Sequence, residues 1–507
     1  MDSRSTFFRS MFVAAGLFCA IFAAEFAMEY IRLGQPSLAD MSWADANNAK
    51  IVDILSPMAR AYNNILAMLI ATIGLAIPLT ANMHTPKLID MFLRDRTNRF
   101  MLFACAFGAA NVLFADWLVG PNFATMWTFR ISVIGAILGW VALVPYFFYV
   151  VRFLDPSNIL SRLKDQTCEA LADVHSGKLA PNKGQVIVHE RLNQIGTIIL
   201  KSIDRADRSV VTEGVWTLKQ ILDVYGEAKA KMPHDWFRVD RQDFVGMSSE
   251  ALELLNEDGT WFEMKVMGQM YLAYQQALSK STDAVSWISD ATRVIGTLAH
   301  QRGDRRAAGL IVKFFNNYLR EAIKRKDMHA LYDLYYQYRC LGRDTTSDAE
   351  LVRKIGGFLR IYSLAAGNAG LTFAAHMAAF DLGWLVRRAY DNGCDAAADL
   401  LAEMLRFDHM AGGKPQPMLI EAKVILGAGL AESGRSAEAE LVRANLSNVP
   451  GSVLGDVAKT LLENTERSFY EVTDRQVNFE FVPPARRPHV KALVEQLAAA
   501  RAEVDNA

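Results

Sequence analysis

Four long apolar stretches near the N-terminus constrain the fold of this chain more than any other feature. The chain has 507 residues, of which 51% are hydrophobic and only 21% are charged. Each stretch reaches about 20 residues or more, the length that a helix needs to cross a hydrocarbon core of about 30 Å. We therefore predict a four-helix transmembrane bundle within residues 1–154, with spans at about 10–31, 62–83, 100–119 and 127–154.

The first stretch has a second interpretation, because Arg4 and Arg9 precede it as basic residues precede the core of a cleaved secretory signal. Two features argue against cleavage. Glu25 and Phe26 interrupt the small residues that a cleavage site needs, and the apolar run outlasts an ordinary signal core. We favour a retained first span.

The basic residues between the spans predict the orientation of the chain. Lys87, Arg94, Arg96 and Arg99 lie between the second and third spans, whereas the stretch Gly120–Phe129, between the third and fourth spans, contains no basic residue. Short connections rich in lysine and arginine stay in the cytoplasm. We therefore predict a multi-pass protein of the inner (cytoplasmic) membrane with both termini in the cytoplasm. The cytoplasmic cysteines form no C-x-x-C, so neither a disulfide framework nor a zinc site is indicated.

The remainder of the chain has helical periodicity almost throughout. We predict a membrane-proximal helical domain at 155–240, a helical-repeat-like cytoplasmic domain at 241–484 and a C-terminal helix or tail at 485–507. Two runs, Gln185–His189 and Gln476–Val482, are interpreted as short strands that could pair with each other. The predicted fold class is therefore all-α, with at most two short strands.

A weak internal repeat occurs in the cytoplasmic part. Gly303, Gly393 and Gly434 each begin the pattern G-x-x-x-x-A-x-L between two amphipathic helices. Paired-helix repeats use such turns, but the spacing from Gly393 to Gly434 exceeds the tetratricopeptide period of about 34 residues. A helical-repeat-like array and an irregular bundle with glycine turns both remain open.

Motifs for known chemistry are missing from the sequence. It contains no phosphate-binding loop, dinucleotide fingerprint, hydrolase elbow or H-E-x-x-H. The formal net charge of −1 gives no general electrostatic attraction for nucleic acid. We therefore expect no enzymatic activity, no cofactor, no bound metal and no nucleic-acid partner.

Ionisable and polar groups within or near the spans are candidates for function, because charge is costly in hydrocarbon unless it is paired or wetted. The candidates are Glu25, Glu29, Asn111, Asp116 and Arg130. One interpretation is structural: Asp116 and Arg130 form an ion pair at the outer interface, and the two glutamates reach the headgroups. The other is a cation pathway shared by several subunits.

A tyrosine-rich segment, Leu331–Gly342, has the most distinctive local composition. Tyr332, Tyr335 and Tyr336 are spaced to share one face of a helix. An exposed face of this kind suits partner binding, since tyrosine combines contact area with a polar tip. Packing in the core is the alternative.

The second and third spans and their connection also resemble a known family. The connection has a run of similar residues: Thr85, Pro86, Lys87, Leu88, Ile89, Phe92, Arg94, Asp95 and Arg96. This run, and a second similarity at Arg191–Ile221, resemble the domain-of-unknown-function 2254 family of predicted bacterial membrane proteins. Asp204–Arg208 replaces that family's usual proline-containing turn. The resemblance extends from about Tyr62 to Gly226, and it implies topology more than function, because the family has no assigned activity.

The features together favour a bacterial membrane-anchored, oligomeric scaffold or interaction protein. Its expected partners are the lipid bilayer, further copies of the chain and a cytoplasmic protein. The alternative is an oligomeric ion channel or transporter-like pore gated by the cytoplasmic domain.

Overall fold

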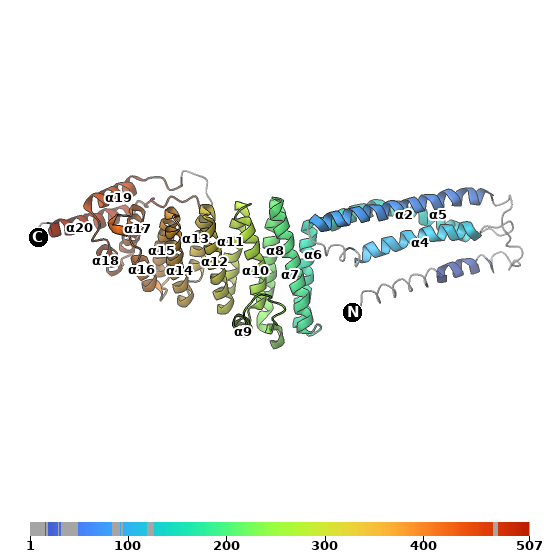
Figure 1. Ribbon diagram of the computed structural model, residues 1–507, viewed down its shortest axis with the longest axis horizontal. Helices are drawn as coiled ribbons and strands as arrows, with labels where there is room; N and C mark the ends of the chain where they lie inside the picture. The colour runs from blue at the N-terminus through green and yellow to red at the C-terminus, as the bar shows by residue number, and fades with distance from the viewer. Residues whose placement is uncertain are drawn as a thin grey trace. The chain divides into compact units, whose positions relative to one another are not determined.

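The computed structural model describes residues 16, 19–28, 30–31, 49–83, 92, 95–118, 126–469 and 475–505. Contacts within the chain divide it into two compact units, Met1–Ile159 and Leu160–Ala507 (Figure 1). Every regular element among the described residues is a helix. The all-α prediction is therefore confirmed.

The first unit contains a short apolar helix, Cys19–Met28, and three longer ones, α2 (Ala49–Met83), α4 (Arg96–Leu118) and α5 (Met126–Leu154). Among the described residues, two helices are long and apolar enough to cross a membrane, Arg96–Trp117 and Thr128–Leu154. They coincide with the third and fourth predicted spans. The four-span bundle is therefore supported only in part.

A notch of small residues receives the ring of Tyr62 and sets the spacing of these helices. A Cβ atom added at Gly108 of α4 would lie 2.6 Å from Cε1 of Tyr62, and one added at Gly135 or Gly139 of α5 would lie 3.4 or 3.7 Å from its hydroxyl oxygen. Tyr62 is 5% exposed and packs with other buried residues of α2, α4 and α5. The glycines therefore leave the space that an aromatic ring fills.

Phe92 and Asp95, in the connection between the second and third predicted spans, anchor that connection to α5. Asp95 caps α4 by accepting a hydrogen bond from the backbone N–H of Asn98 (3.0 Å), and it also accepts one from the hydroxyl of Tyr149 (2.8 Å). Phe92 is fully buried, with its ring edge against Phe153 at a centroid distance of 5.3 Å. These contacts give this part of the motif a structural role.

The second unit is a two-layer array in which each helix packs beside the next helix of its own layer (Figure 1). One layer contains α8 (Arg208–Ala228), α11 (Thr282–Gln301), α13 (Met328–Asp344), α15 (Thr372–Asp391), α17 (Pro417–Glu432) and α20 (Arg487–Asp505). The other contains α7 (Pro181–Asp204), α10 (Trp261–Ala277), α12 (Arg305–Arg325), α14 (Ala349–Asn368) and α16 (Ala397–Leu405). The shorter and flanking helices are α6 (Pro156–His175), α9 (Ser249–Asp258), α18 (Ser436–Asn445) and α19 (Gly451–Glu463). The apolar core lies between the two layers.

The glycines of the sequence repeat occupy turns between consecutive helices of the second unit. Gly303, Gly393 and Gly434 each lie between two consecutive helices and have φ angles of 76°, 65° and 75°. Residues other than glycine rarely adopt this conformation. Lys326, which follows α12, is an exception with a φ of 54°. The sequence pattern therefore identified true turns of the array.

Both strand predictions were wrong. Gln185–His189 lies inside α7, and residues 476–482 form no strand. In α7 the buried positions Gln185, Val188, His189 and Leu192 recur at helical spacing. The helix begins at Pro181, whose fixed φ favours the first helical turn. The β-branched residues Val186, Ile187 and Val188 imitated a strand because the run is short.

Candidate functional site

The buried polar groups of the first unit connect three helices. The side chain of Glu25 is 2% exposed and interacts with the hydroxyl group of Thr128 on α5. The Asn111 side chain of α4 donates a hydrogen bond to Ser132 Oγ, at 3.1 Å. Glu25 and Asn111 are thus both buried within one chain.

The other membrane candidates are more dispersed. Asp116 is half-buried near the end of α4, and Arg130 is exposed in the first turns of α5. Arg96 is exposed at the start of α4. Glu29, Lys87 and Arg94 lie outside the described residues.

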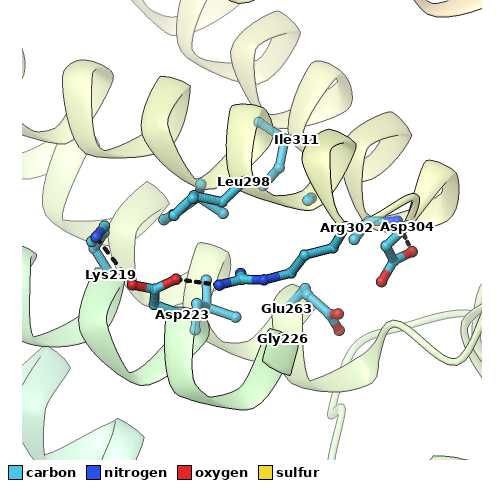
Figure 2. Close-up of a pocket in the computed structure, with 12 residues that line it drawn as sticks. Lys219, Asp223, Gly226, Glu263, Leu298, Arg302, Asp304 and Ile311 are labelled. Carbon is cyan, nitrogen blue, oxygen red and sulfur yellow. Dashed lines mark hydrogen bonds and ion pairs between the residues drawn. The ribbon is translucent and has the colours of Figure 1, made fainter. Parts of the chain in front are cut away.

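An ionic pocket in the second unit lies between α8, α10, α11 and α12. Figure 2 shows Asp223 between Lys219 and Arg302, and the Lys219 Nζ to Asp223 Oδ2 distance is 3.4 Å. A Cβ atom at Gly226 would lie 2.7 Å from Nη1 of Arg302, so this glycine makes room for the guanidinium group. The cavity measures about 30 Å³, which is space for about one water molecule. The pocket is therefore a packing joint and not a ligand site.

Lys229 adds two further ion pairs between these helices. Its Nζ atom lies 2.5 Å from Oε1 of Glu263 and 2.6 Å from Oδ2 of Asp304. Burial raises the pKa of Glu263, although the ammonium group of Lys229 opposes that shift. Burial also acts to lower the pKa of Lys229, but the two carboxylates outweigh it and the pKa rises. The cluster holds the α8, α10 and α12 regions together.

A second buried lysine holds the turn after α16. The Lys423 side chain is fully buried, and its Nζ atom donates hydrogen bonds to Phe407 O (2.8 Å) and Asn445 Oδ1 (2.7 Å). It also lies 2.9 Å from Nδ1 of His409 and 3.3 Å from Leu405 O. Burial lowers the pKa of Lys423 to about 8. The residue closes the end of a helix and is not accessible for chemistry.

The largest depression among those described lies over α13, α15 and α17, beneath a non-helical segment. We call this segment the strap and define it as residues 464–469 and 475–486. It leaves α19, reaches back to α13 and returns to α20 (Figure 1). Its two limbs are joined by Asn478, whose N–H donates to Arg467 O (3.2 Å) and whose side chain donates to Asn464 Oδ1 (3.1 Å). The strap is thus an internal segment bound across one layer of the array.

Arg475 anchors the strap. Its side chain is 1% exposed, and its Nη1 atom lies 3.0 and 2.9 Å from the two carboxylate oxygens of Asp381 on α15, which is fully buried. Arg339 of α13 donates to the same carboxylate at 3.0 Å. The Arg475 guanidinium group also lies over the rings of Tyr332 (4.4 Å) and Tyr336 (5.3 Å). Two cations therefore share one buried carboxylate.

The predicted tyrosine face is divided between the core and the site that holds Arg475. Tyr335 is fully buried, whereas Tyr332 and Tyr336 are half-buried and flank Arg475. The spacing identified the right helix. It did not identify Asp381, Arg339 or Arg475, because these residues meet only in the folded chain.

The strap also brings two carboxyl groups together. Glu421 on α17 is 5% exposed, and among the described residues its Oε2 atom has no hydrogen-bond partner. Burial, together with the nearby charge of Glu480 on the strap, raises the pKa of Glu421 to about 7. The charge of Glu480 on the strap therefore acts on a buried carboxyl group of the array.

The groove bounded by the strap and by α15 and α17 has a volume of about 1090 Å³. It is at the upper end of the sizes seen for ligand sites, about 300–1,000 Å³. Its walls combine arginine side chains with the aromatic residues Phe380, Trp384, Phe479 and Phe481. This groove is the candidate functional site.

Comparison with known proteins bears on the membrane part of the chain. Residues 3–206 match the model of the family described as "Predicted membrane protein (DUF2254)". No curated protein matches the chain. A solved structure, described as a circular tandem repeat protein with novel repeat topology and enhanced subunit contact surfaces, aligns with a TM-score of 0.35 and 13% identity, over 90% of this chain and 97% of that one. The resemblance to the predicted membrane protein family DUF2254 is thus confirmed, with the matched region extending over residues 3–206.

Proposed function

We propose that this protein is a membrane-anchored scaffold whose helical array binds a non-helical segment of a partner protein. One observation carries the proposal: the chain already binds such a segment of itself. The strap crosses α13, α15 and α17, and its Arg475 fills a buried site lined by Asp381 and tyrosine rings. Stacked helical arrays commonly offer extended binding surfaces.

The proposed membrane arrangement is that predicted from the sequence. Four spans in the bacterial inner membrane place both termini in the cytoplasm, where the array meets its partner, and the protein assembles as a homo-oligomer. The match to a predicted membrane protein family and the apolar helices α4 and α5 support the membrane location. The basic residues between the second and third spans support the orientation.

Site-specific photo-crosslinking in cells tests the scaffold function. A photoreactive residue at Ile425, which lines the groove, is compared with one at Leu364, an exposed residue of α14 in the other layer. We expect adducts at Ile425 that map by mass spectrometry to one segment of one protein, and a synthetic peptide of that segment should bind the purified protein. Absence of such adducts at Ile425 and at the exposed groove residue Val477 would contradict the proposal.

The channel alternative requires polar groups that face an axis shared between subunits. Glu25 and Asn111 are each 2% exposed within a single chain, so the described part of the structure does not favour such an axis. Ion flux through liposomes that contain the full chain tests the alternative directly. A current that disappears in the Glu25→Gln variant would favour a channel over a scaffold.

A further inference from the structure

The charges that line the groove are strongly unequal. Among the described lining residues the only carboxylate side chain is Glu466. Five arginines share the same walls: Arg339, Arg387, Arg467, Arg475 and Arg486. The chain as a whole is nearly neutral, with 54 basic and 55 acidic side chains. The excess of positive charge in the groove is therefore local.

Neighbouring acids neutralise only part of this charge. Asp381 is shared by Arg339 and Arg475, and Arg486 pairs with Glu432 at 2.8 Å. Neither Arg387 nor Arg467 has an ion-pair partner within the part of the chain that the structure describes. One carboxylate for two buried or half-buried arginines also leaves a net positive charge at the α13 end.

A glycine of α17 brings two of these cations together. A Cβ atom at Gly429 would lie 3.1 Å from Cδ of Arg387 and 3.4 Å from Nε of Arg486. Without a side chain at this position, an arginine of α15 and the last arginine of the strap converge over α17. On the wall formed by α13 and α15, Arg339 lies over the Trp384 ring at 4.4 Å. Positive groups thus come from more than one wall of the groove, beside aromatic surface.

We propose that the groove binds an acidic, non-helical polypeptide segment of the partner, with carboxylates at Arg387 and Arg467 and an apolar or aromatic side chain between them. This inference rests on the proposed scaffold function and specifies the chemistry of its partner. Arginine is well suited to carboxylate recognition, because its planar guanidinium group presents several fixed donors.

The size and layout of the groove favour a polypeptide over other anions. A small anion needs free donors that converge on one point, whereas these arginines come from α13, α15 and the strap, and of the two that converge over α17 Arg486 is already paired with Glu432. Nucleic acid would be attracted by an extended basic surface, and the chain has a net charge of −1. A segment with alternate acidic side chains can reach arginines that come from separate elements of the walls.

Fluorescence anisotropy with the full-length protein in lipid nanodiscs tests the inference. The probe is a fluorescein-labelled peptide of about 12 residues with alternating glutamate and tyrosine, a length chosen to match segment-in-groove recognition. We expect saturable binding that weakens between about 50 and about 200 mM salt, because the attraction is ionic. A matched peptide with glutamine in place of glutamate should bind at least about tenfold more weakly.

Substitutions in the array locate the binding. Arg387→Gln and Arg467→Gln should each weaken binding about fivefold or more, because each removes a cation without an internal partner. Arg353→Gln, at an exposed arginine of α14 that pairs with Asp399, is the matched control and should leave the affinity unchanged. The melting temperature of each variant shows whether the fold is intact.

The remaining outcomes separate this inference from the proposed function. If photo-crosslinking at Ile425 identifies a partner segment but both arginine variants bind the acidic peptide as wild type does, the scaffold stands and the acidic specificity is wrong. If inorganic phosphate or a single-stranded oligonucleotide competes better than the acidic peptide, the groove serves another class of anion and the inference is overturned.

Discussion

Replacing Arg475 by alanine should release the strap from the array. The side chain is 1% exposed, and its partner Asp381 is fully buried. Breaking a buried ion pair costs about 3–5 kcal/mol, and the lower value applies here because Arg339 still neutralises Asp381. Loss of the cation–π contact with Tyr332 adds about 1 kcal/mol. The strap should thus lose about 4 kcal/mol of docking free energy, or about three orders of magnitude in its closing equilibrium.

Hydrogen exchange followed by mass spectrometry measures this loss. The reporting amides are those of Asn478, which donates to Arg467 O, and Phe481, which donates to Asn478 O, both at 3.2 Å. We expect their protection to collapse in Arg475→Ala, while amides in the middle of α15 stay protected. Arg475→Lys should give an intermediate loss, because it keeps the charge but not the planar guanidinium group.

A surface arginine provides the control for this experiment. Arg443→Ala on α18 removes an exposed pair with Glu440, which should contribute at most about 1 kcal/mol. Unchanged protection in Arg475→Ala, or an equal loss in Arg443→Ala, would refute the conclusion that Asp381 holds the strap.

Three further predictions concern stability. Lys423 should make the free energy of unfolding rise by about 3 kcal/mol between pH 8 and 10.5. In this range the lysine holds a proton in the unfolded chain but not in the native chain. Chemical denaturation should show the rise in the wild type and not in Lys423→Met. Glu421 has the opposite effect, since its native pKa of about 7 exceeds the ordinary value of 4.5; stability should fall as pH rises through this window, and Glu421→Gln should remove that fall. Gly108→Ala should overpack against Tyr62, which should cost about 1–3 kcal/mol in free energy of unfolding and lower the melting temperature in detergent. An unchanged melting temperature would contradict the conclusion that Gly108 leaves the space for the Tyr62 ring.

Much of the fold could be predicted from local pattern. The apolar periodicity predicted an all-helical chain, and Gly303, Gly393 and Gly434 marked real turns of the array. Both signals are local, because a helix face and a left-handed turn depend on neighbouring residues. The run Gln476–Val482 shows the limit of this approach. Its alternation predicted a strand, and this was wrong, because its residue Phe479 packs against the helices α13 and α15 and not against another strand. Which element a segment packs against depends on residues far away in sequence.

The candidate site was predictable only in part for the same reason. Tyr332 and Tyr336 were selected from composition, and they do line the position of Arg475. The carboxylate that pairs with Arg475 lies 94 residues away in sequence, and no spacing rule connects the two positions. Buried arginines such as this one look like ordinary surface charges until the chain is folded.

The path of the strap has a mechanical consequence. The strap tethers the last helices of the array to one another. It follows α19, is held at α15 by the ion pair between Arg475 and Asp381, and leads into α20. Any bending of the array that changes the spacing between α13 and α17 must stretch or relax the strap. A force applied to the first or the last helices of the array would therefore act on the ion pair between Arg475 and Asp381, which would resist the bending until it breaks.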